Sequence, residues 1–82
     1  MVVSFKFRGD AGDRERHEVL DALPGHGARR VDPLAPGTAD PELSRLYLAE
    51  AGSEDDAERI LGYLSSAPAI EFAERPPTRG LR

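Results

Sequence analysis

The chain has 82 residues, with eleven basic side chains against fifteen acidic ones and a formal net charge of −4. This length supports one small domain and leaves no room for an enzyme core with a separate substrate domain. The absence of cysteine excludes disulfides, cysteine-based zinc sites and thiol catalysis. The acidic balance argues against a broad phosphate-binding surface, so we expect no nucleic-acid partner. No apolar run approaches the roughly 18 residues of a membrane span, and the charged N-terminus does not fit a signal peptide, so we expect no membrane partner and a cytoplasmic location.

The chain opens with a pattern typical of a half-buried strand. Val3, Phe5 and Phe7 alternate with polar residues, and all three favour β structure. The turn-forming segment Gly9–Gly12 follows and ends the strand.

A short helix is predicted next. Asp13 is the expected N-cap, and Val19, Leu20 and Leu23 form an apolar stripe at helical spacing. The segment Pro24–Gly27 ends this helix, because proline disfavours a helical residue before it and glycine accepts a left-handed exit.

The middle of the chain carries weaker signals. Residues Ala28–Leu34 are expected to form a strand, with Pro33 marking a sheet edge or an early end. The segment Ala35–Pro41 is a loop. Leu46 and Leu48 alternate with their neighbours and indicate another strand, although a helix over residues 41–51 is a competing interpretation.

The second helix has the strongest pattern. Ser53 is the predicted N-cap, with Asp56 at the position that completes a capping box. Four residues then form one apolar stripe at offsets of three, four and seven: Ala57, Ile60, Leu61 and Leu64. After Ser65–Pro68 ends this helix, Ile70 and Phe72 alternate with Glu71 and Ala73 as a last strand. We expect a domain over residues 1–74 and an extended tail over residues 75–82.

The predicted order β-α-β-β-α-β favours an α+β, ferredoxin-like fold, in which two helices cover one face of a four-stranded antiparallel sheet. Fourteen side chains form the predicted core: Val3, Phe5, Phe7, Val19, Leu20, Leu23, Val31, Leu46, Leu48, Ile60, Leu61, Leu64, Ile70 and Phe72.

No catalytic constellation is visible in the sequence. No serine lies in a Gly-x-Ser-x-Gly elbow, and neither His17 nor His26 has an evident orienting partner. The carboxylates between Glu54 and Glu58 lie in one first helical turn, where anions are expected for helix electrostatics alone. We therefore expect a protein that is not an enzyme and that needs no cofactor or metal.

Two segments resemble a particular family. Residues Val2–Lys6 resemble the opening strand of the inhibitor-type propeptides of subtilisin-like serine proteases, which typically has two apolar residues, a small residue and then Phe-Lys. Residues Pro68–Glu74 resemble the last strand of that family, and the helix Ser53–Leu64 occupies the matching position. The resemblance covers most of the chain by element order and about a dozen residues by motif.

The resemblance implies a folding chaperone and inhibitor of a subtilisin-like serine protease, here free-standing. The open face of the sheet would dock on two protease helices, and the C-terminal residues would enter the substrate cleft as a product does. Glu74 would meet a helix N-terminus on the protease. The residues expected to bind the protease are Tyr47, Glu71, Ala73, Glu74, Thr78, Arg79, Gly80, Leu81 and Arg82, with Arg82 in the primary specificity pocket.

The sequence also departs from the family. Pro76 replaces a second acidic residue, and Arg79 stands where many subtilases prefer an apolar residue. A second interpretation is an interaction or regulatory module of the same fold. In either case the protein is expected to be a monomer or a homodimer formed through its sheet.

Overall fold

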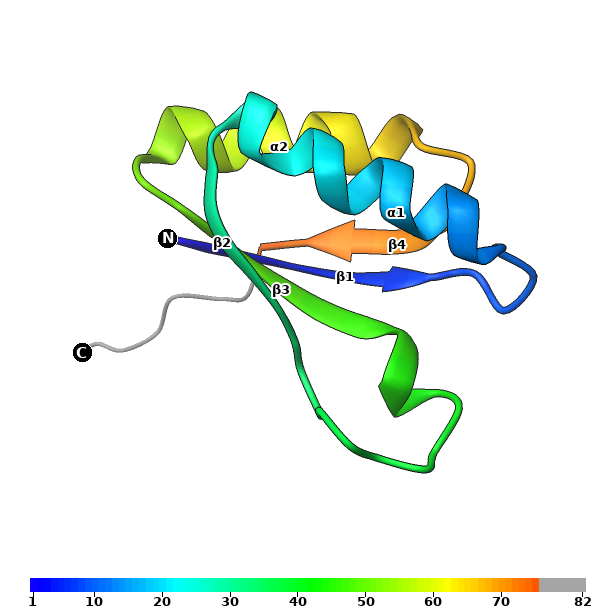
Figure 1. The fold of residues 1–82 in the computed structure, drawn as a ribbon. Coiled ribbons are helices and arrows are strands. Elements are labelled where there is room, and N and C mark those ends of the chain that lie inside the picture. Colours follow the sequence, from blue (N-terminus) through cyan, green and yellow to red (C-terminus); the bar gives the residue numbers. More distant parts are fainter. Residues whose placement is uncertain (76–82) are drawn as a thin grey trace.

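The computed structural model describes residues 1–75. Both helices lie on one face of a four-stranded antiparallel sheet with the strand order β2-β3-β1-β4 (Figure 1), which confirms the predicted ferredoxin-like fold. The elements follow in chain order: β1 Val2–Phe7, α1 Asp13–Ala22, the 3-10 turn η1 Leu23–His26, β2 Ala28–Pro33, the 3-10 turn η2 Leu43–Arg45, β3 Leu46–Ala51, α2 Glu54–Ser66 and β4 Ile70–Glu74.

The two helices begin in different ways. At α2 the Ser53 hydroxyl accepts a hydrogen bond from the Asp56 backbone N–H at 3.2 Å, which confirms the predicted cap. At α1 the prediction of Asp13 as the N-cap is wrong, because the cap residue is Gly12. The Glu15 carboxylate accepts a hydrogen bond from the Gly12 backbone N–H at 3.0 Å. This bond satisfies one of the backbone donors that have no partner inside the helix at its N-terminus.

The strand interpretation of the middle segment is confirmed, and the competing helix is not observed. Residues Leu46–Ala51 form β3, which pairs with both β1 and β2. The loop that connects β2 to β3 extends away from the helices (Figure 1). Strand β2 lies at the sheet edge, as the position of Pro33 indicated.

The core lies between the sheet and the helices. The alternation along β1 places Val3, Phe5 and Phe7 under the helices with no exposed surface. Val19 and Leu23 cover them from the first helical segment, and Ile60 and Leu64 from α2; all four are buried. Three other predicted core residues are only partly buried against this cluster: Leu20, Val31 and Leu61.

The prediction that Leu46 and Leu48 belong to the core is wrong. The Cα of Ala49 pairs with that of Val3, so the odd-numbered residues of β3 face the helices, and Leu48 faces the other way. Ala49 is fully buried, whereas Leu46 and Leu48 are half-buried on the uncovered face. Strand pairing decided the orientation, because period-two alternation is compatible with either face.

The prediction that Phe72 belongs to the core is also wrong. The pairing of β4 with β1 shifts register between Lys6 and Phe7, so Ile70 pairs with Phe7 while Phe72 pairs with Lys6. This irregularity changes the side-chain phase within β4. Ile70 is buried, and the Phe72 side chain is 41% exposed on the face away from the helices.

Candidate functional site

The face of the sheet that the helices leave uncovered is the candidate site, and we call it the open face. Strand register and alternation place ten side chains on it: Val2, Ser4, Lys6, Arg30, Asp32, Leu46, Leu48, Glu50, Phe72 and Glu74.

Apolar side chains occupy part of the open face. Phe72 is 41% exposed, Val2 is 37% exposed and Leu48 is half-buried. Val2 and Leu48 also line a shallow concavity of about 180 Å³, whose charged rim includes Glu50 and Arg30. A surface with an apolar floor and a charged rim is the usual anatomy of a protein-binding patch.

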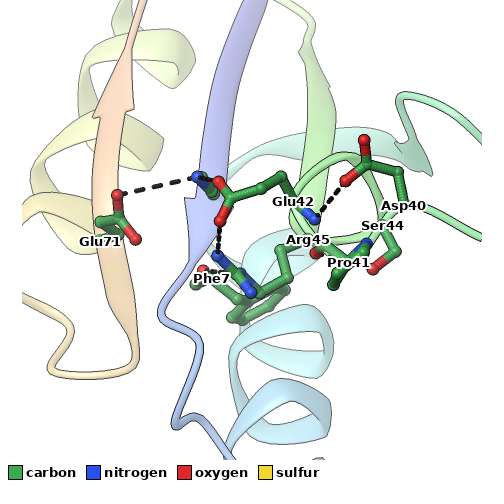
Figure 2. Close-up of polar contacts among 8 residues, drawn as sticks. Phe7, Asp40, Pro41, Glu42, Ser44, Arg45 and Glu71 are labelled. Atoms are coloured by element: carbon green, nitrogen blue, oxygen red, sulfur yellow. Dashed lines mark hydrogen bonds and ion pairs between the residues drawn. The ribbon is translucent and has the colours of Figure 1, made fainter.

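A cluster of charges closes one end of the open face. Glu42, from the loop before β3, forms an ion pair with Lys6 of β1, and its other carboxylate oxygen lies 3.0 Å from an Arg45 guanidinium nitrogen (Figure 2). Glu71 lies 3.8 Å from the same Lys6 ammonium. Arg45 also donates from Nε to the Phe7 carbonyl oxygen at 3.1 Å, so this cluster ties the loop to the end of β1.

The two cations under Glu42 are largely withdrawn from water. The Lys6 and Arg45 side chains are 12% and 15% exposed, against 65% for Glu42. The hydrogen bond and charge of Lys6, followed by those of Arg45, lower the pKa of Glu42 below its usual range. These contacts favour the ionised form of Glu42, which supplies the counter-charge that the two largely buried cations require.

The C-terminal segment begins where β4 ends, at Glu74 and Arg75. Glu74 is exposed on the open face, and its backbone carbonyl accepts a hydrogen bond from the Ser4 hydroxyl at 3.3 Å. The next residue, Arg75, turns toward the helix layer, where its guanidinium nitrogens lie 3.3 Å from Glu54 and 3.4 Å from Glu58 of α2. The expected tail thus begins with a residue that is anchored to α2.

The structure separates the residues that the sequence predicted for protease binding. Tyr47 and Ala73, expected on the open face, both pair with Phe5 and face the helices, so that expectation is wrong. Tyr47 stacks on the Phe5 ring with centroids 5.7 Å apart, because the odd residues of β3 face inward. Glu74 is exposed on the open face, and Glu71 is exposed next to Lys6 of that face. The predicted tail residues Thr78, Arg79, Gly80, Leu81 and Arg82 lie outside the described residues.

Sequence reasoning did not identify Glu42 or the exposure of Phe72. The Glu42 cluster joins residues 36 positions apart along the chain, and no local pattern carries that information. The available signal was the acid itself, which lies in the segment between two predicted strands and three residues before Arg45.

Within residues 1–75, no three His, Cys, Asp or Glu side chains lie together as a metal-ligand group. His26 stacks on Tyr63, with ring centroids 4.4 Å apart, which gives its ring a packing role. In the same part of the chain, neither helix has the length and apolar character required to cross a membrane.

Comparisons with protein-family models, with curated proteins and with solved structures find no match to this chain.

Proposed function

We propose that this protein inhibits, and assists the folding of, a subtilisin-like serine protease. It docks through the open face and places its C-terminal residues in the substrate cleft as a product would. The proposal originates in the resemblance of residues Val2–Lys6 and Pro68–Glu74 to inhibitor-type propeptides. The ferredoxin-like fold is the one that the resemblance implies.

The observation that carries the proposal is the composition of the open face at the end of β4, where the C-terminal segment begins. Phe72 and Glu74 lie two residues apart on β4, both exposed, and the chain continues from them into the C-terminal segment. Phe72 offers apolar area to a docked helix, while Glu74 offers a carboxylate to the positive end of a helix. Two of the features that the docking requires therefore lie on the same strand.

Arg75 supports the same arrangement. Its ion pairs with Glu54 and Glu58 hold the first residue of the C-terminal segment against α2. Pro76 and Pro77 follow directly, and proline stiffens an extended segment and reduces the entropy lost when it is ordered. A segment that begins at an anchored point and continues through two prolines suits insertion into a cleft.

The test is an inhibition assay against subtilisin-like proteases with basic, apolar and small primary pockets. We expect tight inhibition of at least one, a steep rise in the inhibition constant on deletion of residues 78–82, and a comparable rise for Phe72→Glu. His17→Glu adds the same negative side chain on exposed α1 and is the matched control, expected to inhibit like the wild type. Circular dichroism and thermal melting verify that each variant is folded.

Absence of inhibition across the whole panel would contradict the proposal. Equal potency of the wild-type protein, the truncated protein and Phe72→Glu would remove both the tail and the open face from the mechanism.

A further inference from the structure

The outer edge of β2 borders the open face, on the opposite side of the sheet from β4, and has its own pattern of charges. Among the described residues, β2 pairs with β3 alone, so its other edge offers unpaired backbone groups. The Leu34 N–H donates to the Leu46 carbonyl at 2.9 Å, and hydrogen-bonded and non-bonded pairs alternate along an antiparallel ladder. Asp32 therefore points its backbone groups toward β3, whereas Val31 and Pro33 point theirs outward.

Two opposite charges flank Val31 on this edge, one on each side of it along the strand. Arg30 precedes Val31 and Asp32 follows it, and within one copy their side chains form an ion pair at 2.6 Å. Charges on an edge strand usually prevent pairing because like charges meet. Here a second β2 strand, antiparallel and centred on Val31, would place Arg30 opposite Asp32 at two symmetric positions, where opposite charges attract.

We propose that the β2 edge binds a second copy of this chain in that antiparallel register. The two Val31 residues form the central hydrogen-bonded pair about the two-fold axis. Each Arg30 exchanges its partner in the same chain for Asp32 of the other copy. The proposal goes beyond the protease-inhibitor function, because it uses the edge of β2 and leaves Phe72 and Glu74, on the opposite edge strand β4, accessible.

The surroundings of Val31 fit this partner. On the helix-covered side, an apolar groove of about 420 Å³ borders β2, and its walls include Leu20, Val31 and Tyr47. All three are only partly buried in the single copy. A two-fold axis perpendicular to the sheet places both helix layers on the same side, so Val31 of the second copy covers part of this groove.

The same strand limits the extent of the contact. Pro33 has no N–H to donate, and the ladder with β3 is irregular between Ala28 and Arg30. The added pairing is therefore centred on residues 30–32, and the dimer is expected to be weak and concentration-dependent.

The experiment is sedimentation equilibrium of the full chain at protein concentrations up to about 1 mM, which detects a dissociation constant in that range. We expect the wild-type protein to dimerise, and Arg30→Asp and Asp32→Arg each to weaken the dimer by about tenfold or more, because like charges then meet at both symmetric positions. The two side chains are 72% and 52% exposed, so neither substitution disturbs the core. Glu74→Arg introduces a cation on the opposite edge strand and is expected to leave the dimer unchanged.

Complementation tests the register itself. The double variant Arg30→Asp/Asp32→Arg restores opposite charges at both positions and should dimerise again. An equimolar mixture of the two single variants should form a heterodimer, because one strand is then negative at both positions and the other positive. A wild-type protein that remains monomeric at about 1 mM, a dimer insensitive to the single substitutions, or failure of the double variant and the mixture to associate would each overturn the proposal. No protease enters these measurements, so they are independent of the inhibition assay.

Discussion

Gly27 and Asp56, which are distant in sequence, occupy adjoining space at the junction between η1 and the start of α2. Gly27 has a φ angle of +107°, and a Cβ placed on it would lie 2.6 Å from the Asp56 Cγ. Asp56 is also the residue whose N–H is capped by Ser53. Glycine is therefore required at position 27 for two reasons: its left-handed backbone and the close approach of the second helix.

The first prediction follows from this contact. Gly27→Ala should lower the free energy of unfolding by about 1–2 kcal/mol for the left-handed backbone alone, with an additional loss from the displaced Asp56 side chain. Gly25→Ala is the control, because a Cβ there meets no atom within 4 Å and Gly25 has no positive φ angle. Urea denaturation measures both. Equal stability of the two variants would show that the Gly27 conformation relaxes without loss.

The second prediction compares two phenylalanines. Phe5→Ala should reduce the free energy of unfolding by about 3–5 kcal/mol, because the ring is fully buried. Phe72→Ala should reduce it by less than about 1 kcal/mol, because 41% of this side chain is already exposed on the open face. Chemical denaturation of both variants distinguishes them, and similar losses would contradict the placement of Phe72.

The third prediction concerns the dependence of stability on pH. The pKa of Glu42 is lowered in the folded protein, so its ion pairs contribute stability that is fully present at pH values above its unfolded pKa. This contribution is lost as the pH falls through the lower, folded pKa. The wild-type advantage over Glu42→Gln should therefore be largest near neutral pH and shrink in acid.

The partner variant Lys6→Met serves as the control for the third prediction. Lys6 is the largest cause of the lowered pKa, so removing it should reduce the pH-dependent part of the Glu42→Gln effect. Thermal melts of the four proteins of this double-mutant cycle, taken at several pH values, measure the coupling. A difference that does not change with pH would show that the ion pairs contribute nothing to folding.

The fourth prediction rests on the proposed function and concerns Arg82. If the C-terminal residue enters the primary specificity pocket, its permanent charge and fork of donors favour a pocket lined by carboxylates. Arg82→Tyr should shift inhibition toward proteases with large apolar pockets by about 1–3 kcal/mol. Inhibition constants against one protease of each type measure this shift. An unchanged preference would exclude Arg82 as the specificity residue.

Local patterns in the sequence determined most of the secondary structure. Ser53 and the stripe that ends at Leu64 specify α2, because capping and a 3.6-residue period act within a few residues. Pro24 and the glycine at position 27 end the first helical segment for equally local reasons. The alternation of Val3, Phe5 and Phe7 placed β1 correctly, since both phenylalanines share one face with Val3 and are buried there.

Local sequence did not determine which side of a strand faces the helices where both sides of that strand carry apolar residues. Leucines at positions 46 and 48 outweigh the alanines at 49 and 51 by hydrophobicity, yet the pairing of Ala49 with Val3 turns the leucines outward. In β4, one register shift placed Ile70 inside and Phe72 outside. Period-two alternation limits a strand to two orientations, and long-range pairing selects between them.

The candidate site likewise depends partly on local sequence and partly on long-range contacts. The sequence determined by itself that Glu74 ends an alternating strand and that two prolines follow Arg75. Only the tertiary structure decided that Tyr47 packs against Phe5 and that Glu42 reaches Lys6. Those contacts join segments that are far apart along the chain, and they exist because the sheet places β3 beside β1 and leaves one of its faces uncovered.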